Sequence, residues 1–409
     1  MAIVVAVVCS LATSACGLTG ASPTTTTQPD PTAVFLPREH AAVAAAERAV
    51  AVRLPKSIGA PAPSLPAHPF TSDLPAHQVL GFLPYWEVGT VTPDYAGLSS
   101  LAYFAVDVAR GGSLVETGAG WRALASPSLA AVIAAAHAAG DRVLFTLFSE
   151  DPAVIHSLAV APGPTADKLA AAVATQLRSG GFDGVDLDIE GQSTADRPGF
   201  VRFVTSFADR LRGIDPTWSI TLNTYPTSAL DPRGFFDVAA LAPHVDQLFV
   251  MAYDMQNPGV PSATAPLANA SLNDALTLAE YTAIVPARKL ILGIPLYGYD
   301  FPASRGGAPA FTMGTPVAVT YSEIVAAGRK PLWDPASETP WMSFRRGGRW
   351  HQTWFDDPVS IALKTALAAQ FGLAGVGVWE LGMAGGDPQI STALAGGLPP
   401  LRLPLAGAG

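Results

Sequence analysis

A regular alternation of two kinds of segment dominates the chain after residue 76 and limits its possible folds. Short runs rich in β-branched and aromatic residues alternate with Ala-rich stretches of helical periodicity, such as 128–139, 166–178 and 199–211. This alternation is typical of βαβ units, whose strands lie parallel in one sheet. Eight runs are predicted as strands, at residues 78–83, 100–106, 143–148, 184–189, 219–223, 247–252, 289–294 and 375–379. Eight such units predict an α/β fold, a (β/α)8 TIM barrel, with catalytic groups at the C-terminal ends of the strands.

The interval between the seventh and eighth predicted strands is longer than the others. Residues 300–354 are rich in Gly, Pro and aromatic side chains, and they show little helical periodicity. A connection of this length without structure of its own is uncommon in a compact domain. We therefore expect a small α+β subdomain inserted at 300–354, within a catalytic barrel domain that spans 76–400.

The first 75 residues predict export and a spacer rather than a folded core. Residues 1–16 are mostly apolar and end in small residues, as in a signal peptide, and they are too short for a membrane span of about 20 residues. The stretch from Leu11 to Cys16 resembles a bacterial lipoprotein cleavage site, which implies acylation of Cys16 and an extracellular, cell-surface location. An ordinary secretory signal is the alternative, because Thr13 departs from that pattern. Residues 17–75 are rich in Pro and Thr and predict a tether, with a short helix at 41–52.

Charge and cysteine content exclude several classes of function. The formal net charge of −9 argues against a nucleic-acid partner, and no Lys/Arg cluster with interleaved aromatic residues stands out. An uncharged polysaccharide fits this charge balance better than an anionic ligand. Both cysteines, Cys9 and Cys16, lie in the leader, so the folded part is expected to contain no disulfide and no thiol chemistry. Contact with a membrane is expected only through the lipid anchor.

Three acidic side chains are predicted to share one face of the fourth strand. Side chains alternate between the faces of a strand, so Asp186, Asp188 and Glu190 point one way and the apolar residues between them point the other. The apolar face packs on the helices, so the acids point into the barrel, with ~6.5–7 Å between successive ones. Burial and like-charge repulsion keep at least one such carboxyl protonated near neutral pH, as a general acid requires.

A divalent-metal site is the alternative role for these acids. Asp254, Glu380 and Glu150 could supply further ligands to a metal-dependent barrel enzyme. None of the seven His residues forms an HxH or HExxH pair, so we expect no metal and no cofactor.

The acidic strand also carries a family resemblance. Asp183, Asp186, Asp188 and Glu190, preceded by Gly-Phe, resemble the fourth-strand signature of glycoside hydrolase family 18, the chitinase family. The stretches 250–254, 293–299 and 375–380 resemble the motifs of its sixth, seventh and eighth strands. The resemblance covers residues 77–398, and the stretches 297–299 and 354–357 look closest to bacterial spore-cortex and germination-type members. One departure is the stretch 146–150, which stands where many members have Ser-x-Gly-Gly.

The resemblance implies a retaining glycosidase that hydrolyses β-1,4-linked N-acetylglucosamine polymers, chitin or peptidoglycan, by substrate-assisted catalysis. Glu190 would act first as acid and then as base, while the substrate's own acetamido oxygen attacks the anomeric carbon. Asp188 would stabilise the cyclic oxazolinium cation and Asp186 would share a proton with Asp188. Tyr253 would donate its hydroxyl to the acetamido oxygen, and Trp379 would stack beneath the sugar ring.

Further residues at strand ends are candidates for substrate binding, with barrel packing as their alternative role: Met251, Asp254, Tyr297, Tyr85 and Trp86. Asp183 falls outside the acidic face and is expected to anchor the start of the strand. A lectin-like barrel of the same family, which binds carbohydrate without cleaving it, is the alternative function. Such barrels typically lack the Glu of the motif, and Glu190 is present here.

Overall fold

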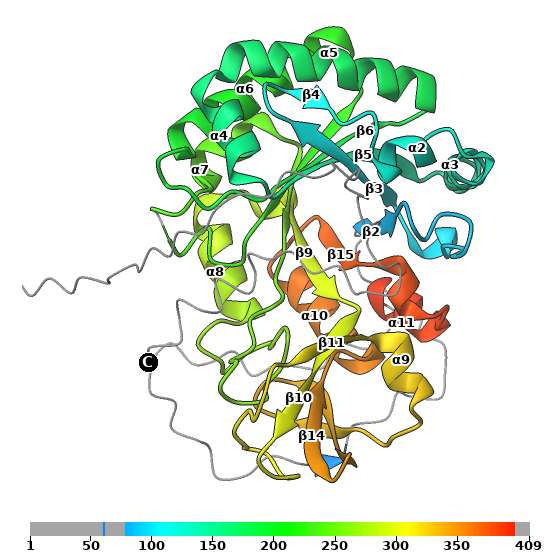
Figure 1. The fold of residues 1–409 in the computed structure, drawn as a ribbon, viewed down its shortest axis with the longest axis vertical. Helices are drawn as coiled ribbons and strands as arrows, with labels where there is room; N and C mark the ends of the chain where they lie inside the picture. Colours follow the sequence, from blue (N-terminus) through cyan, green and yellow to red (C-terminus); the bar gives the residue numbers. More distant parts are fainter. Residues whose placement is uncertain (1–59, 62–77, 232, 397–409) are drawn as a thin grey trace, which may run out of the picture. The chain divides into compact units, whose positions relative to one another are not determined.

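The computed structural model describes residues 60–61, 78–231 and 233–396, and its centre is a closed parallel barrel. The strand order is β2-β15-β9-β8-β7-β6-β5-β3, and the barrel closes because β2 pairs with both β15 and β3 (Figure 1). The barrel strands are β2 (Gln78–Pro84), β3 (Ser100–Ala109), β5 (Arg142–Ser149), β6 (Gly184–Ile189), β7 (Ser219–Thr224), β8 (Gln247–Val250), β9 (Leu290–Pro295) and β15 (Gly375–Trp379). The predicted (β/α)8 class is confirmed. The predicted leader, Cys16 and the helix expected at 41–52 lie outside the described residues.

Helices connect the strands and form the outer layer (Figure 1). The helical segments are η2 (Tyr95–Gly97), α2 (Ala119–Ala123), α3 (Pro127–Ala139), α4 (Pro152–Val160), α5 (Pro162–Gly180), α6 (Arg197–Ile214), α7 (Val238–Leu241), η3 (Ala242–His244), α8 (Asp274–Ile284), η4 (Ala287–Lys289), α10 (Pro358–Gln370), η5 (Leu381–Ala384) and α11 (Pro388–Leu394). Local sequence sets their ends. In α3, for example, Ser126 accepts a hydrogen bond from the Leu129 amide, and Gly140 ends the helix at φ 90°.

The observed strands differ from the predicted ones mainly at their ends. The strand predicted at 247–252 stops at Val250, because the backbone turns: the Ala252 amide donates to the Val250 carbonyl and the Tyr253 amide to that of Met251, both at 2.8 Å. Strand β3 continues to Ala109 and pairs with the short antiparallel strand β4 (Ser113–Leu114). Tyr253 therefore sits on a turn at the end of β8 rather than beyond a longer strand.

A second, antiparallel sheet is inserted between β9 and β15. It contains β10 (Tyr297–Ala303), β11 (Val317–Thr320), β12 (Leu332–Asp334), β13 (Thr339–Arg346) and β14 (Arg349–Trp354), with α9 (Tyr321–Ala326) between β11 and β12. The order is β1-β12-β13-β14-β10-β11. Strand β10 begins two residues after β9 ends, so the inserted sheet starts directly at the C-terminal rim of the barrel. This is the α+β insertion expected from the sequence. Its first strand begins at Tyr297, slightly before the expected residue 300.

The outermost strand of that sheet comes from the stretch predicted as a tether. Ala60–Pro61 forms β1, which pairs antiparallel with Trp333 and Leu332 of β12. The sequence did not predict this pairing, because two residues, one of them a proline, carry no strand periodicity. Within the described residues, no helix is both long and apolar enough to span a bilayer.

Candidate active site

Strand β6 carries the acids. Asp186 and Asp188 lie within β6 and Glu190 follows its last residue; their side chains are 0%, 3% and 1% exposed. Side chains two apart on a strand share a face, and the alternate residues of β6 are apolar and buried. The structure therefore places three carboxyl groups in one row that ends at the C-terminal rim of the barrel, where barrel enzymes hold their catalytic groups.

Neighbouring strands surround the first of these acids with polar groups. Thr146 of β5 and Thr221 of β7 are the residues paired with Asp186 in the sheet. Asn223 of β7 donates from Nδ2 to Oδ2 of Asp186 at 3.3 Å. Burial, and after it the negative charge of Asp188, raise the pKa of Asp186 well above its usual value. Burial beside Asp188 therefore favours the protonated form of the Asp186 carboxyl.

Tyr253 lies among these acids. It is 3% exposed, and its hydroxyl has a pKa far above the usual value, first because of burial and then because of the charges of Asp188, Glu190, Asp254 and Asp186. The phenol is therefore a permanent hydrogen-bond donor beside the carboxyl row. Met251, two residues earlier, is buried, and its amide donates to the Thr224 carbonyl at 2.9 Å.

Asp254 is held by two tyrosines from β10. The Tyr297 hydroxyl donates to Oδ1 of Asp254 at 2.7 Å, and the Tyr299 hydroxyl donates to the same atom at 2.9 Å. Burial raises the pKa of both phenols, so both remain donors. Asp254 also has a φ of 57°, a left-handed conformation that is rare outside glycine. The contacts from β10 thus fix a carboxylate whose backbone is in a rare conformation, next to Tyr253.

The predicted aromatic residues Trp379, Trp86 and Tyr85 take part in ring contacts near the end of the barrel strands. Trp379, at the end of β15, is 4% exposed and meets Phe104 edge-on at 4.6 Å between ring centroids. Trp86 also meets Phe104 edge-on, at 6.1 Å between ring centroids. Tyr85 packs on Trp86 at 4.9 Å, but burial and the charge of Asp107 raise its pKa, so its hydroxyl lies beside Asp107. Packing therefore accounts for much of what these side chains do, and Trp379 and Trp86 are joined through Phe104.

The remaining acids occupy separate positions. Asp183 accepts hydrogen bonds at 2.8 Å from the ring of His137 and from the Val143 amide, which makes it an anchor for the start of β6. Glu380 accepts from the Gly382 amide, and burial, followed by the charge of Glu87, raises its pKa to about 8. In the part of the chain that the structure describes, no three His, Cys, Asp or Glu side chains are grouped so that they could hold a metal ion.

Two contacts of the site were missing from the sequence-based expectations: Asn223 on Asp186 and Tyr299 on Asp254. Each had a weak signal. Asn223 is a polar residue near the end of a buried strand, and Tyr299 follows Tyr297 at the spacing that places both side chains on one face. Neither signal names a partner, because the partner lies on a distant segment of the chain.

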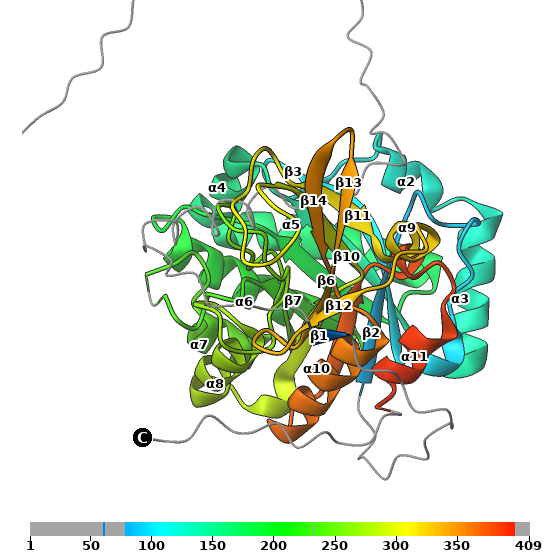
Figure 2. The same ribbon diagram turned by 90° about the horizontal axis from the view of Figure 1, so that it is seen from below.

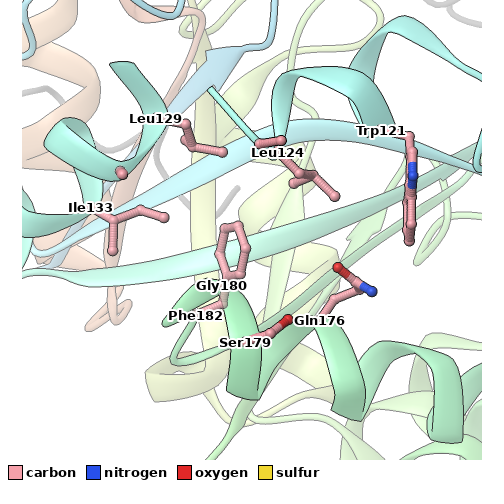
Figure 3. Close-up of a pocket in the computed structure, with 10 residues that line it drawn as sticks. Trp121, Leu124, Leu129, Ile133, Gln176, Ser179, Gly180 and Phe182 are labelled. Carbon is pink, nitrogen blue, oxygen red and sulfur yellow. The ribbon is translucent and has the colours of Figure 1, made fainter. Parts of the chain in front are cut away.

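A cavity of about 340 Å³ lies elsewhere, between α2, α3 and the end of α5 (Figure 3). It is lined mostly by apolar side chains, with Trp121, Gln176 and Phe182 among them, and it contains none of the predicted site residues. The carboxyl row on β6 thus remains the candidate centre.

A closed parallel barrel with clustered acids at its C-terminal rim defines a TIM-barrel protein, and TIM-barrel enzymes hold their active sites at that rim. The chain belongs to the glycosyl hydrolases family 18, whose sequence model matches residues 154–384. This range contains the carboxyl row, Tyr253, Asp254, Tyr297 and Trp379.

The sequence is also similar to individual curated proteins. The chain is similar to di-N-acetylchitobiase of Mus musculus, at 28% identity over 226 residues, covering 49% of this chain and 60% of that protein. It is also similar to the cortical fragment-lytic enzyme of Bacillus anthracis, at 24% identity over 306 residues, covering 70% of this chain and 65% of that protein. The chain spans about half to two-thirds of the length of the curated relatives it matches.

Among solved structures, the fold matches a family 18 chitinase from Cycas revoluta in complex with (GlcNAc)3. The TM-score is 0.68 at 20% identity, covering 78% of this chain and 98% of that one. At this identity the match shows a shared fold.

Proposed function

We propose that this protein is a retaining glycosidase that hydrolyses β-1,4-linked N-acetylglucosamine polymers by substrate-assisted catalysis. One observation carries the proposal: the row Asp186, Asp188 and Glu190 ends beside the hydroxyl of Tyr253, in a buried site at the C-terminal rim. The names of the relatives, a di-N-acetylchitobiase and a cortical fragment-lytic enzyme, support this substrate class.

In the proposed reaction the substrate supplies the nucleophile. Glu190 donates its proton to the glycosidic oxygen, and the bond from that oxygen to the anomeric carbon breaks. The carbonyl oxygen of the 2-acetamido group attacks the anomeric carbon and forms a cyclic oxazolinium ion. Glu190, now a carboxylate, takes a proton from water, and the water oxygen opens the ring with retained configuration.

The other side chains of the row stabilise the charged intermediate. Asp188 accepts a hydrogen bond from the acetamido N–H and balances the positive charge. The raised pKa of Asp186 keeps a proton between it and Asp188, so the pair carries a single negative charge. Tyr253, which stays protonated, donates to the acetamido oxygen and positions it for attack. Trp379 offers an apolar ring to the C–H face of the sugar.

The replacement Glu190→Gln tests the general-acid role. We expect a loss of about 10²–10⁴-fold in kcat on an N-acetylglucosamine oligomer, because the amide cannot transfer the proton. The melting temperature should stay within a few degrees, since size and shape are kept. Unchanged turnover would exclude Glu190 as the acid, and sugar binding without cleavage by the wild type would indicate a lectin-like barrel.

The domain plan and location are proposals of the same kind: a leader at 1–16, a tether at 17–75 and an extracellular lipoprotein acylated at Cys16. Metabolic labelling with a fatty acid, compared between the wild type and Cys16→Ala in a bacterial host, tests them. We expect label on the wild type alone, and equal absence of label from both would leave the simple secretory signal.

A further inference from the structure

The tip of the β13–β14 hairpin concentrates positive charge on an acidic protein. Five of the 24 lysines and arginines lie between residues 329 and 349, in a chain of net charge −9. This cluster, interleaved with the aromatic residues Phe344 and Trp350, was absent from the sequence-based expectations. The hairpin projects from the inserted sheet (Figure 2).

The turn forces two of these arginines together. Gly347 and Gly348 have φ values of 57° and 77°, which a two-residue hairpin turn of type I′ requires. This turn fixes the register, so that Arg346 and Arg349 stand directly opposite each other. Like charges at such a cross-strand pair destabilise a sheet. An anion bound at the tip would offset this repulsion.

Aromatic rings hold two further guanidinium groups without neutralising them. Arg345 lies over the ring of Trp350 at 4.7 Å, and Arg329 lies over Phe344 at 4.1 Å. The ring of Phe344 is in turn stacked on His351, at 5.6 Å between centroids. A guanidinium held by its face keeps its N–H donors free in the plane of the group, where they can bind a carboxylate.

Little negative charge lies against this cluster. Asp300 is ion-paired with Arg346 at 2.5 Å and accepts a hydrogen bond from His351 at 2.9 Å. Within the described residues, no carboxylate forms an ion pair with Arg329, Arg345 or Arg349, and all three are exposed. The tip therefore has a positive surplus, although the whole chain is acidic.

The hairpin belongs to the same sheet as the tyrosines that hold Asp254. Tyr299 of β10 pairs with Trp354 of β14, and Ala303 pairs with Trp350. Ala303 is four residue steps along the extended strand from Tyr299, so the cluster begins roughly 13 Å farther along the sheet than Tyr299. The same strands thus connect the tyrosines that hold Asp254 to the hairpin.

We propose that Arg329 and Arg349, which lie on the Phe344 face of the hairpin, form a docking surface for the carboxylates of an acidic glycan. The ligand would be a strand in which N-acetylglucosamine alternates with a sugar that carries acidic peptides, whose carboxylates would bind the arginines. The neutral unit would lie at the carboxyl row and the acidic units at the hairpin. This inference rests on the proposed function, and it revises the expectation of an uncharged polymer, because the local field of the hairpin differs in sign from the net charge.

Binding to purified bacterial cell walls tests the proposal. The walls are first stripped of phosphate-containing polymers, and all proteins carry Glu190→Gln so that the walls stay intact. We expect the further replacements Arg329→Gln and Arg349→Gln to weaken binding by roughly tenfold at low salt, with the difference shrinking in high salt. Binding to insoluble chitin, which is neutral, should change less than twofold.

The matched control is Arg202→Gln with Arg288→Gln, which removes the same charge from exposed sites on α6 and η4. An equal loss in this control, or an equal loss on chitin, would overturn the proposal. So would binding that depends on the arginines only before the phosphate polymers are stripped. Failure of the proposed function is a separate result: wild-type protein that releases no sugar from either polymer.

Discussion

The replacement Lys364→Met would remove a buried cation from between two buried carboxylates. Lys364 lies in α10 and is 1% exposed; its Nζ contacts Oδ2 of Asp274 at 3.0 Å and Oδ1 of Asp356 at 3.3 Å, and it donates to the Ala265 carbonyl. Breaking a buried ion pair by deleting one partner typically costs about 3–5 kcal/mol. We therefore expect the free energy of unfolding to fall by about 3–5 kcal/mol and Tm by roughly 6–10 °C.

The assay is urea unfolding at pH 7.5, with Lys168→Met as the control. Lys168 is exposed on α5, so its replacement should change the free energy of unfolding by at most about 1 kcal/mol. Adding Asp274→Asn to Lys364→Met should restore part of the loss, because one of the two uncompensated charges is then removed. A loss below 1 kcal/mol in Lys364→Met would refute the reasoning, as would a further loss in the double variant.

Three further predictions concern the site and its surroundings. Tyr299→Phe removes one of the two hydroxyls on Asp254 and should lower kcat/KM about three- to tenfold, measured on N-acetylglucosamine oligomers; an unchanged value would show that Tyr297 suffices. Burial raises the pKa of Asp274 to about 7. Between pH ~4 and ~7 the folded state therefore holds a proton on Asp274 that the unfolded chain has lost. The contribution of Asp274 to stability should therefore fall as pH rises from ~4 to ~7, and urea unfolding across this range should show a smaller slope in Asp274→Asn. Treatment with a chelator should leave hydrolysis intact, and a complete loss restored by a divalent ion would favour the metal-dependent alternative.

The fold was predictable because it repeats. Each strand–helix unit carries its own periodicity, so β6 and β15 appear in the structure with the predicted bounds, 184–189 and 375–379. The shared face of Asp186, Asp188 and Glu190 follows from the two-residue period of a strand alone. The end of β8 was not predictable, because a backbone turn rather than side-chain pattern stops it after Val250.

Contacts between distant segments could not be predicted from the sequence. Asn223 meets Asp186, and Lys364 meets Asp274, only because the barrel brings separate strands and helices together. The arginine cluster was missed for a related reason. Its residues are spread over 329–349 in the sequence. The turn at Gly347 and Gly348 places Arg346 opposite Arg349, and Arg329, from the segment before β12, lies over Phe344.

The pairing of β1 with β12 bears on where a self-sufficient catalytic fragment begins. A shortened chain starting at residue 76 would keep every barrel strand but lose Ala60–Pro61, leaving the backbone amides and carbonyls of Leu332–Asp334 open along one side. Unpaired backbone of this kind invites association with another chain. Such a fragment would therefore be more prone to self-association than one that begins before residue 60, even though both contain the carboxyl row.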